Sequence, residues 1–199
     1  FNRKVITEPF NRTVLEEIAH DIDPESPEEQ GKTLIYAVND QHADMIVSIL
    51  KEIYSETGVD NDAIMKITGS VGGGNKKKVQ EAIKRFKNER YPSIAVTVDL
   101  LTTGIDVPEI TTLVFMRRVK SRILFEQMLG RATRLCPDIH KTHFEIYDPV
   151  GVYDSLEPVN TMKSVVTNPN TTFTQLIEGL EVLDNGGKVK NQINQIIAK

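Results

Sequence analysis

Short apolar runs alternate with amphipathic stretches along the first three quarters of the chain. The apolar runs are six to nine residues long and rich in β-branched residues, as in strands buried inside a parallel sheet. They cover residues 33–38, 63–68, 93–101, 111–116 and 143–148. Apolar residues recur at helical spacing in four further stretches, residues 13–22, 41–57, 76–88 and 121–135.

The order of these elements predicts an α/β fold, a mostly parallel sheet with helices on both faces. Right-handed crossover connections are expected between the strands. The acidic stretch 23–31 and the glycine-rich stretch 69–75 are expected to be loops. Ligands of such sheets bind beyond the carboxyl ends of the strands. The residues that follow the strands are therefore the candidates for function: Asn39, Thr68–Gly69, 99–106, Arg117–Arg118 and Asp148.

Composition narrows the class of protein further. The chain has 199 residues, 39% hydrophobic and 26% charged, which excludes collagen-like, coiled-coil and strongly disordered chains. No apolar run approaches the roughly 18–20 residues of a membrane-spanning helix. Cys136 is the single cysteine, so no internal disulfide is possible, and a reducing compartment fits. The chain begins with Phe1 rather than Met, which indicates a piece of a longer protein.

The sequence predicts three regions. Residues 1–30 form an N-terminal helix and linker, and residues 31–152 contain the alternating strands and helices. Three prolines punctuate the sequence after residue 148, and helical patterns return at roughly residues 172–184 and 188–198. Residues 153–199 are therefore expected to be a linker and the start of a short helical appendage.

Charge is distributed unevenly along the chain. The formal net charge is −4, which does not by itself indicate nucleic-acid binding. Six basic residues nevertheless fall within eighteen positions that contain only one acid, Glu126. They are Arg117, Arg118, Lys120, Arg122, Arg131 and Arg134. A local basic face of this kind can bind phosphates on an acidic protein.

Some apparent motifs favour ordinary explanations. Gly31-Lys32-Thr33 ends like a Walker A loop, but Ser26 stands where that motif needs a glycine, and an acidic segment precedes it. The chain also lacks a strand that ends in an acidic cluster, so alone it should not hydrolyse ATP. Gly72–Gly74 are expected to connect a strand with a helix. His140 and His143 have zinc-like spacing without enough further ligands, so no metal site is expected.

Residues 98–108 form the first informative segment, a strand end followed by a loop of hydroxyls, one glycine and one carboxylate. Thr102 and Thr103 can donate to a phosphate, and Gly104 permits a close backbone approach. Asp106 can accept from a ribose hydroxyl or pair with an arginine. A strand-end turn with an aspartate cap explains the segment equally well.

Residues 127–134 form the second informative segment. If the helix predicted over residues 121–135 is continuous, Gln127, Arg131 and Arg134 lie at i, i+4 and i+7 on one face. Two arginines on one face can grip a γ-phosphate and stabilise charge in its transition state, as an arginine finger does. A solvated basic helix is the alternative.

These two segments together resemble motifs V and VI of the second RecA-like domain of superfamily-two helicases and translocases. TLIYAVNDQHADMIVSIL resembles motif IV, and Ile67-Thr68-Gly69 with its following helix resembles the region between motifs IV and V. This resemblance covers about residues 30–150. Within the superfamily, VTVDLLTTGIDVPEITTLVFMRRVKSRILFEQMLGRATRLCPDI, ITEPFNRTVLEEIAHDIDP and NPNTTFTQLIEGL are similar to the R (motor) subunit of type I restriction enzymes.

The resemblance implies a role for each candidate residue. Arg134 would be the arginine finger, Arg131 a γ-phosphate sensor, and Gln127 a residue that positions the phosphate or the attacking water. Gly104 and Asp106 would line the nucleotide side of the cleft. DNA phosphates would be contacted by Thr68, Gly69, Asn39, Thr102 and Thr103. ATP and Mg²⁺ would be held mainly by a first motor domain that this chain does not contain.

The resemblance therefore implies the second motor domain of an ATP-dependent double-stranded DNA translocase, a fragment of an R subunit. Its implied partners are duplex DNA, the first RecA-like domain, and the methyltransferase and specificity subunits, in the cytoplasm. Another superfamily-two DNA or RNA helicase is an alternative. A non-catalytic α/β module whose arginines bind an anion is a second alternative, from a different class.

Overall fold

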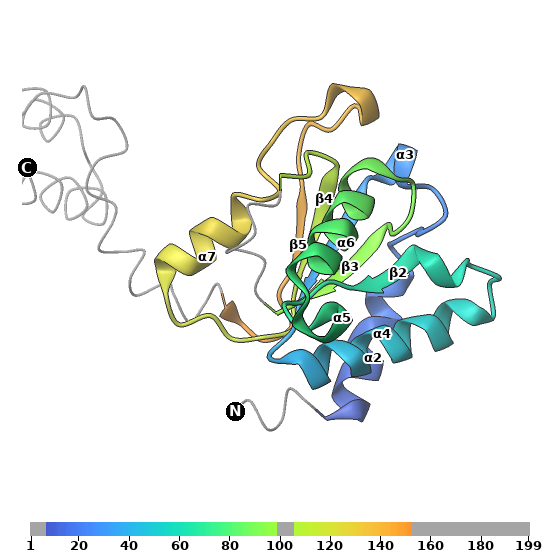
Figure 1. The fold of residues 1–199 in the computed structure, drawn as a ribbon, viewed down its shortest axis with the longest axis vertical. Helices are drawn as coiled ribbons and strands as arrows, with labels where there is room; N and C mark the ends of the chain where they lie inside the picture. Colours follow the sequence, from blue (N-terminus) through green and yellow to red (C-terminus); the bar gives the residue numbers. More distant parts are fainter. Residues whose placement is uncertain (1–6, 99–105, 153–199) are drawn as a thin grey trace, which may run out of the picture. The chain divides into compact units, whose positions relative to one another are not determined.

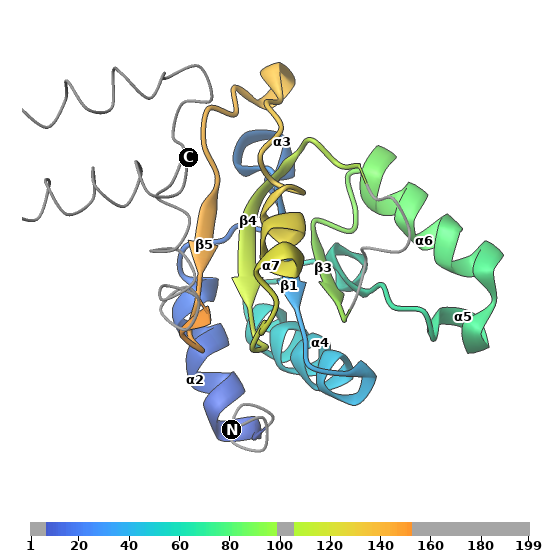
Figure 2. The same ribbon diagram turned by 90° about the vertical axis from the view of Figure 1, so that its left-hand side faces the viewer.

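A computed structural model of the chain describes residues 7–98 and 106–152. Its centre is a five-stranded sheet in the order β2-β3-β1-β4-β5, in which all neighbouring strands run parallel (Figures 1 and 2). The strands are β1 (Lys32–Tyr36), β2 (Ile64–Lys66), β3 (Ile94–Thr97), β4 (Ile110–Phe115) and β5 (Glu145–Tyr147). The α/β fold and the parallel sheet that the sequence predicts are confirmed.

The helices occupy the stretches between the strands. They are α2 (Glu8–Ala19), α3 (Pro27–Gln30), α4 (Asp40–Ser55), α5 (Val71–Gly74), α6 (Lys76–Asn88) and α7 (Arg122–Leu129), with 3₁₀ turns at Asn61–Ala63 and Pro137–Ile139. The chain's contacts divide it into residues 1–152 and 153–199. Among the described residues, no helix combines the length and the apolar character that crossing a membrane requires.

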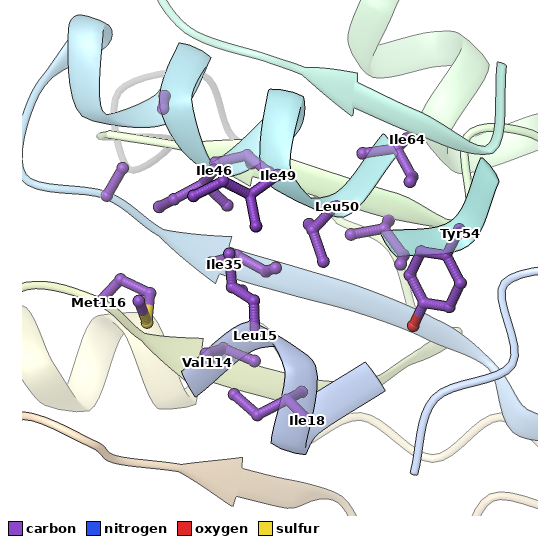
Figure 3. Packing of buried hydrophobic residues seen from close by; sticks show 14 of the residues in the cluster. Leu15, Ile18, Ile35, Ile46, Ile49, Leu50, Tyr54, Ile64, Val114 and Met116 are labelled. Carbon is purple, nitrogen blue, oxygen red and sulfur yellow. The ribbon is translucent and has the colours of Figure 1, made fainter. Parts of the chain in front are cut away.

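Helices α2 and α4 cover one face of the sheet. Leu15 and Ile18 of α2 and Ile46, Ile49 and Leu50 of α4 belong to one buried cluster (Figure 3). The strand residues of this cluster are Ile35, Ile64, Ile94, Val96 and Val114. Leu15 and Ile46 are completely buried, so the N-terminal helix is part of this core. Burial of apolar area on this scale is the main stabilising term for the fold.

The opposite face is covered by α6 and α7. The ring of Tyr36 stacks on Phe115 at 5.4 Å between centroids, and Phe115 contacts Phe125 of α7 at 5.3 Å. The Tyr36 hydroxyl donates to the carbonyl of Met128 at 3.4 Å. Phe86 of α6 is fully buried beside Lys32, whose Nζ lies 5.3 Å from the ring centroid. Even and odd positions of β1 thus serve different faces, as the two-residue period of a strand requires.

The helix predicted over residues 121–135 is too long. Helix α7 ends at Leu129, and Gly130 follows it as the C-cap. The backbone N–H groups of Arg131 and Ala132 turn to the carbonyls three residues back, at 3.3 and 2.9 Å. Glycine weakens a helix, and such three-residue bonds tighten its last turn. Ala132 is then fully buried, which anchors the chain beyond the helix.

The two stretches expected to be loops contain single helical turns. Pro27–Gln30 form α3 inside the acidic stretch, with proline at its first position. Val71–Gly74 form α5, but Gly72 and Gly73 have φ of +64° and +73°, so the helical path breaks there. Asn75 then accepts from the backbone N–H of Lys77 and begins α6. Glycines in the left-handed region let the chain turn from β2 into α6 within a few residues.

Candidate functional site

The carboxyl edge of the sheet gathers candidate residues from several strands, as parallel strands require. Asn39 and Asp40 follow β1, Thr68 and Gly69 follow β2, Arg117 follows β4, and Asp148 follows β5. Some of these side chains have structural uses. Asn39 caps α4 by accepting from His42 N–H at 2.9 Å, and Asp148 accepts from Val152 N–H at 2.9 Å. The side-chain oxygen of Asn39 is therefore used in the helix cap, and its side-chain N–H groups remain as donors.

Arg134 and Asp106 form an ion pair across 28 residues of sequence. Nη1 of Arg134 lies 2.5 Å from Oδ2 of Asp106. Their side chains are 59% and 39% exposed, so both groups are accessible to a ligand from solvent. The structure thus joins one residue from each informative segment, the loop after β3 and the turn after α7. A guanidinium held by a carboxylate has the geometry that also suits a phosphate.

The interpretation of Gln127, Arg131 and Arg134 as one helix face is wrong. Gln127 is exposed on α7, whereas both arginines follow the end of that helix at Leu129. Arg131 is half-buried in the turn, and Arg134 is exposed beyond it. The helical period therefore does not determine their relative positions. Their placement comes from the turn at Gly130 and from the buried Ala132.

The loop between β3 and β4 is described only from Asp106 onward. Thr102, Thr103 and Gly104 lie outside the described residues, so their predicted roles stay predictions. Arg117, half-buried, donates from Nη1 to the carbonyl of Val98 at 2.8 Å. This bond ties the exit of β4 to the last described residue after β3.

Asp40 links the segments that follow β1 and β2. We call these two segments, residues 39–40 and 68–70, the corner. Its Oδ1 accepts from the hydroxyls of Thr68 and Ser70, both at 2.5 Å. Its Oδ2 lies 2.9 Å from Nζ of Lys66, which also contacts Asp44 at 2.6 Å. These hydrogen bonds, from Ser70, then Thr68, then Lys66, lower the pKa of Asp40 to about 2. The carboxylate is stabilised because each donor favours the charged form.

This corner changes what Thr68 can do. Its side chain is buried, and its one hydroxyl proton is donated to Asp40. Because a hydroxyl has one proton, Thr68 cannot also donate to a phosphate in this arrangement. At Gly69 there is open space where a Cβ would stand, so an anion can approach the backbone there. A DNA contact at this corner, which stays a prediction, is better suited to the backbone than to the Thr68 side chain.

The Gly31-Lys32-Thr33 tripeptide is structural, as its sequence context indicates. Nζ of Lys32 donates to the carbonyls of Phe86, Glu89 and Pro92 at 2.6, 2.5 and 3.3 Å. The residue is 3% exposed. Burial lowers the pKa of Lys32, an effect that the charge of Glu109 opposes. An ammonium enclosed in this way is not available to a nucleotide.

Sequence reasoning missed the most connected residue at this edge. The sequence indicates Asn39-Asp40 only as a helix cap, and it does not indicate the bond from Ser70 to Asp40, which joins positions thirty residues apart. Only its position could have indicated Asp40 as a candidate, because Asp40 directly follows Asn39 after the end of a strand. Within the described part of the chain, no group of three or more His, Cys, Asp or Glu side chains is arranged to hold a metal ion.

Comparison with known proteins gives consistent matches. The family described as the helicase conserved C-terminal domain matches residues 12–136. The endonuclease subunit of the type I restriction enzyme EcoKI from Escherichia coli (strain K12) is 46% identical over 187 residues, which cover 93% of this chain. That stretch is only 16% of the relative, so the chain corresponds to a small part of it.

Solved structures support the same fold. A fragment of an HsdR subunit of a type I restriction enzyme from Vibrio vulnificus YJ016 superposes with a TM-score of 0.62 and is 26% identical. The superposition covers 78% of this chain and 30% of that one. Domain 2 of the DEAD-box helicase Mss116p, solved with an RNA duplex, has a TM-score of 0.59. At 17% identity, with 94% of this chain and 72% of that one covered, it supports the fold alone.

Proposed function

Because the chain belongs to the family of helicase conserved C-terminal domains, we propose that it is the second RecA-like motor domain of an ATP-dependent DNA translocase. The similarity to the EcoKI endonuclease subunit supports a more specific proposal, that it is part of the R subunit of a type I restriction enzyme. It would then work in the cytoplasm beside a first motor domain and with methyltransferase and specificity subunits. The partner subunits would select the DNA site, and this domain would help to move the duplex.

One observation supports the proposal most directly, the ion pair between Arg134 and Asp106. Arg134 holds an oxyanion at 2.5 Å while more than half of its side chain remains exposed. A neighbouring domain could therefore present a phosphate to the same guanidinium. Released from Arg134, the Asp106 carboxylate can accept from a ribose hydroxyl. The two residues together suit the triphosphate and the sugar of one nucleotide.

The residues of this chain would complete an ATP site rather than form one alone. Arg134 would stabilise the negative charge that develops on the terminal phosphate, Arg131 would contact the same group, and Gln127 would orient the water. A Mg²⁺ ion would neutralise charge on the phosphates when bound, held by the first motor domain. This division fits the described residues, in which Lys32 is enclosed by carbonyls. Hydrolysis would then open and close the cleft between two domains.

DNA contacts are proposed at the carboxyl edge of the sheet, where the chain leaves β1 and β2. Asn39 Nδ2 and the backbone of Gly69 would bind phosphates, together with Thr102 and Thr103. Contacts to the phosphate backbone carry no sequence preference, which suits a motor that moves along any sequence. Thr68 would not contact the DNA with its side chain, because its hydroxyl donates to Asp40 and helps to hold this corner in place.

The experiment uses the longer polypeptide that contains this chain, assembled with its DNA-recognising partners. Displacement of a third strand from a duplex reports ATP-dependent translocation, and phosphate release reports hydrolysis. Arg134→Ala should lower ATP turnover by about 10³–10⁵-fold and abolish displacement, while DNA binding is kept. Arg90→Ala is the matched control, because Arg90 is exposed and pairs with Glu28. It should leave both activities unchanged.

The alternatives predict different outcomes. A non-catalytic anion-binding module would lose phosphate affinity in Arg134→Ala without any change in turnover. Another superfamily-two helicase would lose turnover but would show no plasmid cleavage that depends on unmodified DNA. Turnover and displacement that survive Arg134→Ala would show that this arginine is not a finger.

A further inference from the structure

Helix α6 carries more positive charge than any other helix in the described residues. Its thirteen residues contain six basic side chains and one acid, Glu81. The basic residues are Lys76, Lys77, Lys78, Lys84, Arg85 and Lys87. The chain as a whole has a net charge of −4, so this helix is a strong local exception. A surface with this charge attracts anionic partners.

Four of the lysines share one side of the helix. At about 100° per residue, they and Gln80 fall within a sector of roughly 100° around the helix axis. We call this group the lysine stripe: Lys76, Lys77, Gln80, Lys84 and Lys87. All five residues are exposed, and the buried residues Val79, Ala82 and Phe86 lie on the other side of the helix. Glu81 lies outside the sector, so the stripe contains no acid.

The stripe differs in its pairing from six basic residues elsewhere in the described part of the chain. Arg12, Lys66, Arg85, Arg90, Arg122 and Arg134 all lie within 3.5 Å of a carboxylate. Among the described ion pairs, none includes a lysine of the stripe. Arg85, the basic residue of α6 that does pair, contacts Asp62 and Glu89 and lies off the stripe. The stripe therefore keeps its full charge toward solvent.

The beginning of α6 is also unusual for a helix. Its first turn has no acid and three lysines, whereas α2, α3 and α4 have acids there and α7 has no acid and one arginine. The partial positive charge at a helix N-terminus disfavours lysines there. An anionic partner along the stripe would offset this repulsion. A sequence that breaks a local rule in this way is typical of a functional surface.

We propose that the lysine stripe binds the phosphate backbone of duplex DNA, outside the corner formed by Asn39 and Gly69. This rests on the proposed function and adds a second contact region to it. Helix α6, green in Figures 1 and 2, begins directly after α5 and so follows the exit of β2. The stripe thus extends from the edge at which the DNA corner lies.

The dimensions of the helix fit this partner. Thirteen residues span about 20 Å, which matches roughly six base pairs of duplex at 3.4 Å each. Lysines bind phosphates as point charges on flexible stems and do not read bases. The contact is therefore independent of sequence, and the choice of duplex as the partner rests on the proposed function.

The test measures binding of this 199-residue chain to a fluorescent duplex by anisotropy, between 50 and 200 mM salt. The slope of log Kobs against log salt concentration gives the number of phosphate contacts, because each contact adds about 0.9 to its magnitude. The triple variant Lys77→Gln, Lys84→Gln, Lys87→Gln should lower this slope by about 2 to 3 and weaken binding at least tenfold. The thermal midpoint should not change, since these side chains are exposed.

A matched pair of single variants excludes a general effect of net charge. Lys84→Gln removes a charge from the stripe, and Lys51→Gln removes one from α4, on the opposite face of the sheet. Only Lys84→Gln should lower the slope, by about 1. Three outcomes would each overturn the proposal. They are equal slopes for these two variants, an unchanged slope in the triple variant, and no binding by the unmodified chain at 50 mM salt. Polyglutamate serves as a probe for an acidic protein. If the triple variant loses binding to polyglutamate but keeps its binding to DNA, the proposal is overturned and the stripe is assigned to an acidic protein.

The failure of this proposal is distinguishable from failure of the proposed function. If Arg134→Ala leaves ATP turnover intact while the stripe variants change the salt slope, the DNA surface stands and the motor assignment falls. If the reverse holds, the motor assignment stands and the stripe is a solvated face.

Discussion

Three side chains donate hydrogen bonds to Asp40, and this fixes both its charge and the use of its neighbours. Ser70 and Thr68 have no proton left for another acceptor, and Lys66 is divided between Asp40 and Asp44. In a second group, Asp106 holds Arg134 near the start of β4. Each of these two groups thus has a carboxylate that already binds the side chains a phosphate would bind. A phosphate that enters either group must displace the carboxylate or use the backbone.

The low pKa of Asp40 gives a prediction at this scale. Ser70→Ala removes a hydrogen bond to the carboxylate, so the pKa of Asp40 should rise from about 2 toward its ordinary value of 3.8. A carboxylate with a depressed pKa stabilises the folded state above its unfolded pKa and loses this stabilisation as pH falls through the folded value. The unmodified chain should therefore lose Asp40's contribution nearer pH 2, and the variant nearer pH 4.

Carbon-13 NMR of the Asp40 carboxyl group measures this titration directly. Ser55→Ala is the control, because the Ser55 hydroxyl donates to the Glu52 carbonyl on α4 and not to Asp40. An unchanged Asp40 midpoint in Ser70→Ala would show that Ser70 does not hold the carboxylate in solution.

For Asp106 the sequence leaves two partners open, a ribose hydroxyl or an arginine, and the structure pairs it with Arg134. Asp40 was not found, because its partners Thr68 and Ser70 come from another strand exit and no local pattern joins them. Spacing also failed at Arg131 and Arg134, because it assumed a helix that ends at Leu129.

At the scale of elements, a buried histidine joins α2 to α4. Nδ1 of His42 accepts from the backbone N–H of Val38 at 3.1 Å, which leaves Nε2–H to donate to Asn11 Oδ1 at 2.8 Å. Asn11 in turn donates to the carbonyl of Thr7 at 2.9 Å. These bonds connect the exit of β1, the first turn of α4 and the beginning of α2. They require a neutral imidazole, because protonation would remove the acceptor at Nδ1.

This link predicts how stability depends on pH. Burial lowers the pKa of His42 from 6.5 to about 4. Below pH 6.5 the unfolded chain binds a proton that the folded chain excludes, so the free energy of unfolding should fall between about pH 6.5 and 4. The total loss from this residue is about 3 kcal/mol, and above pH 6.5 it contributes no pH dependence.

Urea unfolding at several pH values checks this prediction. His42→Gln should be less stable than the unmodified chain at pH 7, because it loses buried hydrogen bonds, but its stability should fall less between pH 6.5 and 4. His20→Gln is the control, since His20 is exposed just after α2. A His42→Gln variant with the same pH profile as the unmodified chain would contradict a neutral buried imidazole.

Element boundaries show what the sequence pattern can determine. Helix α6 spans Lys76–Asn88, the same bounds that periodicity predicts, because Asn75 caps it and its apolar positions are regular. Four of the five strands are shorter than the predicted apolar runs, and β4 has the length of its run but begins one residue earlier. Met116, the last residue of that run, is buried although the ladder of β4 has ended. The turns in α3 and α5 depend on proline and glycine conformations that hydrophobic spacing does not detect.

At the scale of the whole domain, the charged side chains are of two kinds. Lys32 and Lys141 are almost fully buried, and their ammonium groups donate to backbone carbonyls. Arg134 and Asp106 pair with each other and have exposed side chains. Charges of the first kind hold the chain together, and charges of the second kind remain available to a partner. This division fits the proposed function, in which the domain folds around its own core and a second domain completes the nucleotide site.

The last prediction follows from that division. The isolated 199-residue chain should fold but release no phosphate from ATP above background, with or without duplex DNA. Its one lysine in a Walker-like context, Lys32, is enclosed by the carbonyls of α6 and of Pro92, so it cannot approach a phosphate while the core is intact. A phosphate-release assay on the purified chain measures this, with the longer polypeptide as positive control. Turnover by the chain that disappears in Arg134→Ala would contradict the two-domain site, because this domain would then bind and cleave the nucleotide with its own residues.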